Sequence, residues 1–188
     1  MRQMPIPGVF APIWWKKMRA FSEDKRGIAA VEFALIATPF FFLIFGLLEI
    51  CVIFIMSSIL EHASGEASRQ IRTGQFQALN GGSPTQTDFE NLICPELFGL
   101  LDCNGLEIDV QTFSDFSGAP NSSPPVDGSG DFDNSGFGFD PGGQNDIVVV
   151  RVFYQWDLII PGLSKPLENI NGNKRLLQAT IAFRNEPF

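Results

Sequence analysis

Histidine and charge are both scarce in this sequence of 188 residues, which has one histidine and only 18 % charged residues. Any Ser-His-Asp or Cys-His nucleophile arrangement would have to use His62. G-x-S-x-G, P-loop and G-x-G-x-x-G motifs are all missing. We therefore expect no enzyme activity, no metal ion and no cofactor, although the many acidic residues leave a glycosidase-like carboxylate pair open.

The few charges are unevenly distributed along the chain. Residues 1–27 carry six basic and two acidic residues, residues 28–60 carry only Glu32 and Glu49, and residues 61–188 carry seven basic and seventeen acidic residues. A basic head, an apolar middle and an acidic remainder are typical of a single-pass membrane protein. They argue against a nucleic-acid binder, which needs clustered Lys and Arg.

The apolar middle predicts a transmembrane helix over residues 28–60. As a helix, Ile28 to Met56 would run about 43 Å against about 30 Å of bilayer hydrocarbon. The positive-inside rule places the basic leader, residues 1–27, in the cytoplasm and the rest beyond the membrane. A secretory signal peptide is the competing interpretation, but the segment is longer than an h-region and no A-x-A-like site follows closely.

Two carboxylates interrupt this apolar segment. Glu32 and Glu49 are 17 residues apart, about 26 Å along a helix, so we expect them near opposite faces of the membrane. They would also lie about 100° apart around the helix axis, so each needs its own partner. The alternative for both is a carboxylate solvated at the membrane interface.

Residues 27–35, Gly-Ile-Ala-Ala-Val-Glu-Phe-Ala-Leu, resemble the processing motif of TadE-like proteins, pseudopilins of the Tad (tight adherence) pilus system. The resemblance continues in residues 69–75, 149–156 and 183–188. It implies cleavage by a prepilin peptidase between Gly27 and Ile28, which would place Glu32 fifth in the mature chain. It also implies an inner-membrane protein whose partners are the peptidase and other Tad pilus and assembly-platform proteins.

A role for Glu32 in subunit register follows from its position. Cleavage would create a positive amine at Ile28, which in a stack of helices lies near the carboxylate of a neighbour, and the low dielectric would strengthen that pairing. For Glu49 we expect a second intramembrane contact.

Beyond the membrane, helical spacing of apolar residues predicts a helix extension over residues 61–80, with the helix reaching about Phe76 and Gly74 placed to end it. Residues 81–188 form the predicted β domain. Its strands are expected at residues 106–113, 147–158 and 177–183. Because no helix is expected between the strands, we predict an antiparallel sheet packed on the long helix, which makes an α+β, pilin-like fold.

Residues 118–143 are rich in Gly, Pro, Ser, Asn and Asp and predict a long loop that is mobile or functional. Asp131, Asp133 and Ser135 imitate the start of an EF-hand loop. However, Gly142 stands where a bidentate glutamate is required, so we do not expect calcium.

Three cysteines are present. Cys51 lies in the predicted span, where we expect inert packing. Cys94 and Cys103 lie outside it, and we favour a disulfide between them in an oxidising compartment. Two separate buried thiols are the alternative.

Two functional hypotheses follow. The first is a TadE-like pseudopilin in the bacterial inner membrane that acts in assembly of an adherence pilus. The second is an uncleaved membrane anchor that displays a periplasmic binding module, with the Gly-rich loop contacting an envelope partner.

Overall fold

The computed structural model describes residues 27–116, 124–160 and 164–188. The predicted leader before Gly27 and residues 118–123 of the predicted loop lie outside the described residues. The chain divides into two compact units, Met1–Ile44 and Phe45–Phe188.

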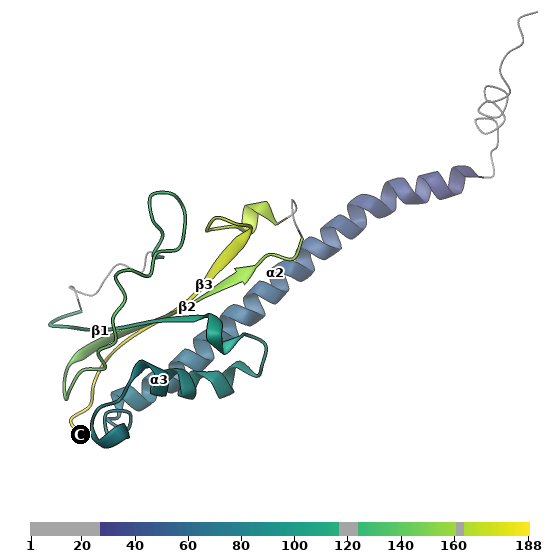
Figure 1. Cartoon of the computed structure of the whole chain (residues 1–188). Coiled ribbons are helices and arrows are strands. Elements are labelled where there is room, and N and C mark those ends of the chain that lie inside the picture. Colours follow the sequence, from purple (N-terminus) through teal and green to yellow (C-terminus); the bar gives the residue numbers. More distant parts are fainter. Residues whose placement is uncertain (1–26, 117–123, 161–163) are drawn as a thin grey trace, which may run out of the picture. The chain divides into compact units, whose positions relative to one another are not determined.

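A single long helix, α2 (Ile28–Arg72), contains the predicted span (Figure 1). In its first part the apolar side chains, among them Val31, Phe33 and Leu35, are exposed to the surroundings. A helix that is apolar all round is suited to lipid. Among the described residues, α2 is the one helix long and apolar enough to cross a membrane.

Helix α2 ends four residues earlier than predicted. Gly74 has φ +77°, in the left-handed region, and its N–H donates to the Ile71 carbonyl at 3.1 Å. This conformation terminates the helix, as predicted for Gly74. Short 3₁₀ turns occur later at η2 (Leu79–Gly81), η3 (Cys94–Leu97), η4 (Cys103–Gly105) and η5 (Lys165–Leu167).

Three antiparallel strands form the sheet in the order β1-β2-β3. They are β1 (Leu106–Phe113), β2 (Ile147–Asp157) and β3 (Lys174–Arg184). The first two match the predicted strands almost residue for residue, and β3 begins three residues earlier and ends one later than predicted. The predicted α+β class, with a membrane-capable helix and a small antiparallel sheet, is confirmed.

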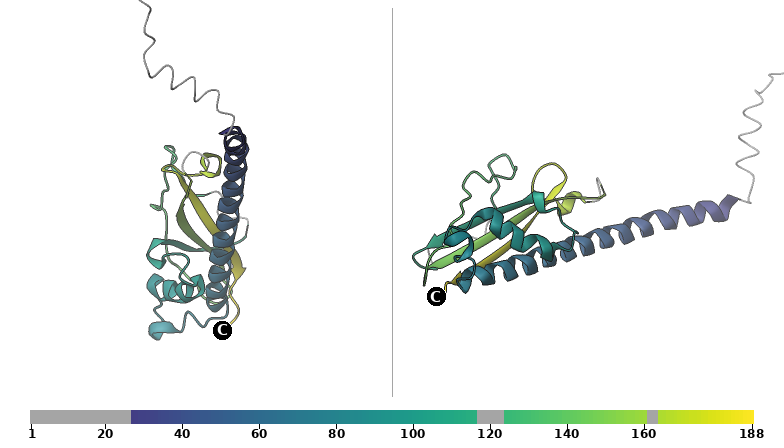
Figure 2. Two further views of the ribbon diagram at one scale, coloured as in Figure 1. Left: turned by 90° about the vertical axis from the view of Figure 1, so that its right-hand side faces the viewer. Right: turned by 60° about the horizontal axis from the view of Figure 1, so that its bottom comes forward.

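The main core lies between the second part of α2 and one face of the sheet (Figures 1 and 2). The helix contributes mostly small side chains where it meets the sheet, which allows a close approach: Ala63, Ser64, Ala67 and Ser68 are all buried. The sheet contributes alternate residues of its strands, as expected for one buried face: Ile108, Val110, Val148, Val150, Val152, Leu177 and Ala179.

A second helix, α3 (Gln86–Ile93), was not predicted. Its first turn is held by a capping box, in which Thr85 Oγ1 accepts from the Asp88 N–H and the Asp88 carboxylate accepts from the Thr85 N–H. Phe89 is fully buried, with its ring centroid 5.7 Å from that of Phe76. Helix α3 therefore completes the core beside α2.

The opposite face of the sheet is covered by the described part of the Gly-rich loop. The Phe137 ring stacks on Phe153 of β2 at 5.3 Å, and Phe132 lies 5.9 Å from the same ring. Ile170 and Leu176 complete this smaller cluster. Residues 124–143 thus pack against the domain, where the sequence suggested only a mobile or functional loop.

Candidate functional site

The predicted processing site lies at the beginning of α2. Gly27 precedes the helix and is exposed, and a β-carbon built on it meets no atom within 4 Å. Ile28 and Glu32 are also exposed. Because i and i+4 positions share one face of a helix, the Glu32 side chain lies one turn beyond Ile28 on the same face.

Glu49 is placed differently, because it is only 2 % exposed within the Phe45–Phe188 unit. One carboxylate oxygen, Oε1, accepts from the Ile159 N–H at 2.6 Å and the Ile160 N–H at 3.4 Å. The other, Oε2, accepts from the Ser164 hydroxyl. Both oxygens are therefore hydrogen-bonded to the connection between β2 and β3, a partner within the same chain.

Glu32 and Glu49 are not brought together. They stand seventeen positions apart on α2, which corresponds to about 26 Å of rise in a regular helix. Glu32 belongs to the Met1–Ile44 unit, whereas Glu49 belongs to the domain. The two carboxylates are thus two separate features of the chain.

Two of the segments for which the sequence suggested a family resemblance, residues 69–75 and 183–188, meet at the far end of α2. The Glu186 N–H donates to the Arg72 carbonyl at 2.9 Å, and the Arg72 Nε lies 3.3 Å from the Glu186 carboxylate. Asn185 is buried, and its side-chain amide donates to the carbonyls of Pro141 and Gly143. These contacts hold the closing segment, residues 183–188, against the end of the helix.

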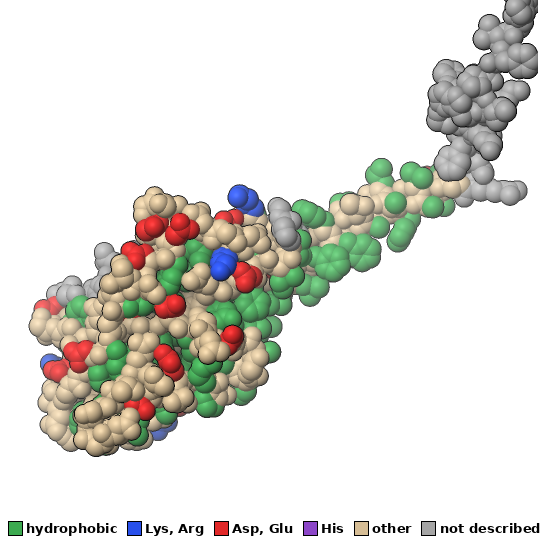
Figure 3. Space-filling model, in the orientation of Figure 1, with side chains coloured by type: hydrophobic (Ala, Val, Ile, Leu, Met, Phe, Trp, Pro, Cys, Tyr) green, Lys and Arg blue, Asp and Glu red, His purple; other side chains and the backbone are tan. Residues whose placement is uncertain are grey.

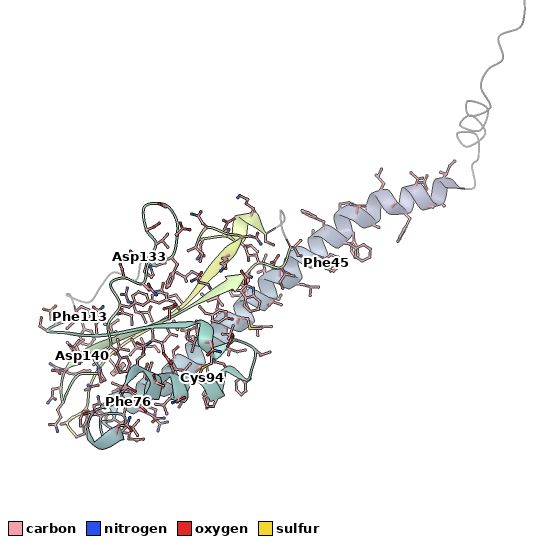
Figure 4. The ribbon with its side chains drawn as sticks, viewed as in Figure 1. Phe45, Phe76, Cys94, Phe113, Asp133 and Asp140 are labelled. Carbon is pink, nitrogen blue, oxygen red and sulfur yellow. A yellow bond between two sulfur atoms is a disulfide. The ribbon has the colours of Figure 1, made fainter. Side chains whose placement is uncertain are left out.

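Residues 149–156 form most of β2, and Arg151 among them makes a partly buried ion pair. Arg151 Nη2 lies 2.6 Å from Asp109 Oδ2, and the Asp109 side chain is 1 % exposed. Asp109 Oδ1 also accepts from the Gly138 N–H at 2.9 Å. The Arg151 guanidinium lies 5.9 Å from the Phe137 ring. The Asp109–Arg151 pair therefore attaches the Gly-rich loop to the sheet. The loop can be found in Figure 4 by its labelled residues Asp133 and Asp140.

The remaining candidate groups are dispersed. His62 is exposed and lies 3.9 Å from Glu96. Within the three described stretches, no group of three or more His, Cys, Asp or Glu side chains is arranged to hold a metal ion. Hydrogen bonds from the Ser135 side chain and its N–H hold the pKa of the Asp133 carboxyl below its ordinary value. Asp133 is therefore bonded to its own loop.

Cys94 and Cys103 form a disulfide that joins the end of α3 to the start of β1 (Figure 4). Cys51 is a free, exposed cysteine on α2. The 94–103 bridge closes the segment that carries Leu97 and Leu101 into the core.

The fold and these sites define a class: a membrane-capable N-terminal helix that continues into a small α+β domain. The family described as "TadE-like protein" matches residues 27–69. This match begins at Gly27, includes Glu32 and Glu49, and confirms the resemblance over most of α2. Comparisons with curated proteins and with solved structures found no match.

Sequence reasoning missed α3 and the partner of Glu49. The pattern Thr85-x-x-Asp88 is a capping-box signal and could have revealed the helix. No local signal pointed to the contact between Glu49 and Ile159, because the two residues lie 110 positions apart.

Proposed function

We propose that this protein is a TadE-like pseudopilin that acts in assembly of a Tad pilus for surface adherence, from the bacterial inner membrane. The observation that carries the proposal is the family match, which begins at Gly27, directly before the membrane-capable helix. A prepilin peptidase on the cytoplasmic side cuts between Gly27 and Ile28. The exposure of Gly27 supports access of a peptidase to this bond.

Glu32 then sets the register between subunits. The new amine at Ile28 of one subunit pairs with the Glu32 carboxylate of a neighbour, in surroundings where the low dielectric strengthens the attraction. The exposure of Glu32 supports this role, because an exposed carboxylate is free to meet another chain. Glu49 is already hydrogen-bonded within its own chain and is not assigned the same role.

The mature N-terminus tests the processing step. Mass spectrometry of the protein isolated from membranes, with and without the cognate peptidase, should find Ile28 as the first residue only when the peptidase is present. Gly27→Val should block cleavage, and Gly65→Val is the matched control, since a β-carbon at either glycine meets no atom within 4 Å. A chain that keeps its leader in the presence of the peptidase would contradict the proposal.

The assembly step needs a separate test. Glu32→Ala should leave the protein in the membrane and cleaved while pilus number and adhesion fall. Val31→Ala, at a neighbouring exposed position, is the control and should leave pili unchanged. A normal pilus number in the Glu32→Ala strain would contradict a role of Glu32 in assembly.

The uncleaved anchor with a periplasmic binding module is the alternative. It requires residues 1–27 to remain attached, so the same N-terminal measurement separates the two functions.

A further inference from the structure

Strand β3 has a free edge on the side away from β2. Near its start, the Leu176 N–H donates to Asn169 Oδ1 at 2.6 Å and the Leu176 carbonyl accepts from Asn169 Nδ2 at 3.2 Å, so the Leu176 backbone faces this side. In an antiparallel strand the backbone groups of every second residue face the same side. Thr180 and Ala182 therefore face it too and form what we call the open edge of β3. Both residues are exposed, and within the described stretches their N–H and C=O groups have no hydrogen-bond partner.

Other parts of the sheet's two edges are covered by this chain itself. At β1, the Val110 N–H donates to the Gly138 carbonyl and the Val110 carbonyl accepts from the Asp140 N–H, both at 2.8 Å. Residues 138–140 thus lie along β1 as an extended segment. The Asn169 side chain covers the start of the β3 edge in a similar way. The open edge of β3 lacks such cover, and an unpaired strand edge is a template for another strand.

A groove of about 310 Å³ lies between α2 and the open edge. Its lining includes Gly65, Ser68 and Arg72 of α2 and Ile181 and Phe183 of β3. A β-carbon built on Gly65 meets no atom within 4 Å, so the helix leaves room at this point. Because side chains alternate along a strand, a strand added at the open edge would direct every second side chain toward the groove. Backbone pairing and a surface for alternate side chains are the two features by which an extended peptide joins a sheet.

The charge of β3 differs from that of the domain around it. Residues 61–188 carry seventeen acidic and seven basic residues, and acidic side chains are spread over the face of the domain shown in Figure 3. In contrast, β3 carries Lys174, Arg175 and Arg184 and no acidic residue. Arg184 is exposed, donates to the Asn145 carbonyl at 3.0 Å and forms no ion pair with a described carboxylate. A partner strand with an acidic side chain opposite Arg184 is therefore complementary in charge.

A second copy of this chain does not fit the open edge in antiparallel pairing. Strand β3 runs in the same direction as the part of α2 beside it, because Glu49 bonds to Ile159 before β3 and Arg72 bonds to Glu186 after it. Antiparallel pairing of two β3 strands would therefore point the two α2 helices in opposite directions. Two chains held in one membrane by their N-terminal helices do not have that arrangement.

We propose that the open edge of β3 binds an extended segment of a different polypeptide, which adds to the three-stranded sheet as a further strand. Its backbone pairs with Thr180 and Ala182, and its apolar side chains fill the groove beside α2. On its other face, an acidic side chain lies opposite Arg184. The proposal needs α2 to hold the chain in a membrane and does not depend on cleavage after Gly27.

Photo-crosslinking in the bacterium that makes the protein tests the contact. The full-length chain carries the photo-reactive residue benzoylphenylalanine in place of Thr180, which is exposed. Irradiation should join position 180 to one other polypeptide, and mass spectrometry should locate the junction in a segment with alternating apolar and polar residues. The same photo-reactive residue in place of Leu79, an exposed residue of η2, is the control and should not capture this segment.

Proline substitution separates strand addition from a contact of side chains alone. Ala182→Pro removes an N–H that has no partner in the described chain, and proline is tolerated on an edge strand where the missing N–H faces outward. We expect Ala182→Pro to keep its circular dichroism and Tm close to those of the parent while crosslinking at position 180 falls about tenfold. Ala182→Ser keeps the N–H and should crosslink as the parent does.

Two further measurements keep the test decisive if Ala182→Pro does not fold. In the purified protein, the amides of Thr180 and Ala182 should exchange hydrogen fast, whereas those of Ile181 and Phe183, which face β2, should exchange slowly. Arg184→Glu should lower crosslinking at position 180 about fivefold because it places like charges opposite each other. Arg184→Lys keeps the positive charge and should not.

Crosslinking only to a second copy of this chain, or to no polypeptide, would overturn the proposal. Undiminished crosslinking in a folded Ala182→Pro protein would also overturn it. Slow exchange at Thr180 and Ala182 in the purified protein would mean that the chain covers its own edge. Equal crosslinking in Arg184→Glu would overturn the acidic character of the partner segment.

Discussion

The aromatic ring of Phe188 occupies the space that a β-carbon on Gly74 would need. Gly74 also has φ +77°. Only glycine satisfies both conditions, so the end of α2 and the last residue of the chain are packed against each other. The ion pair of Arg72 and Glu186 reinforces the same junction.

Gly74→Ala should therefore destabilise the domain. The left-handed conformation alone costs about 1–2 kcal/mol for a residue with a β-carbon, and the Phe188 ring must also move. Urea unfolding of the detergent-solubilised protein, followed by circular dichroism, measures the change. Gly65→Ala, in the interior of α2 with open space around it, should instead stabilise by about 0.5–1 kcal/mol. Equal effects of the two substitutions would contradict this account of the junction.

The pair of Asp109 and Arg151 should be the most sensitive polar contact in the domain. Arg151→Ala leaves the Asp109 carboxylate buried without its partner, which we expect to cost about 3–5 kcal/mol of unfolding free energy. Hydrogen exchange of residues 124–143 should rise at the same time, since Asp109 also holds the Gly138 N–H. Arg69→Ala, which removes an exposed pair with Glu66, should change stability by less than about 0.5 kcal/mol. If residues 124–143 keep their protection from hydrogen exchange in Arg151→Ala, the pair of Asp109 and Arg151 does not hold this loop to the sheet.

The cap of α3 should make stability depend on pH in the acidic range. Hydrogen bonds from the Thr85 side chain and its N–H, with a smaller contribution from Asn80, hold the pKa of Asp88 below its ordinary value of 3.8. Because the folded-state pKa is the lower one, the stabilisation is present above pH 3.8 and is lost as the pH falls through the folded-state pKa. Asp88→Asn should flatten this part of the stability profile, measured as Tm against pH. An unchanged profile of Tm against pH would show that Asp88 is not the group whose titration changes stability in this range.

Thiol alkylation and mass spectrometry can check the disulfide in the protein from membranes. Without reductant we expect one alkylated cysteine, Cys51, and after reduction and unfolding three. The double change Cys94→Ala and Cys103→Ala should lower the free energy of unfolding by about 2–3 kcal/mol, because the bridge closes a short loop. Cys51→Ala is the control and should have little effect. Three reactive thiols without reductant would exclude the bridge.

The strands and the long helix could be read from the sequence, because their signals are local. Alternation of apolar and polar residues marked β1, and the dense Val and aromatic content marked β2. Helix α3 was not predicted because it is short. Its sequence signal is the capping box of Thr85 and Asp88 rather than a helical spacing of apolar residues. For the Gly-rich loop, composition predicted a mobile or functional segment. It did not predict that Phe132 and Phe137 would pack against the sheet.

By itself, the sequence determined the membrane-capable helix, its beginning after Gly27, the glycine that terminates it (Gly74) and the α+β class, since each depends on neighbouring residues and their periodicity. Only the tertiary structure decided what Glu49, Asp109 and Phe188 contact. Their partners Ile159, Arg151 and Gly74 lie 42 to 114 positions away in the sequence. The difference has a physical cause: a buried carboxylate requires hydrogen-bond donors, but any segment that packing brings near can supply them.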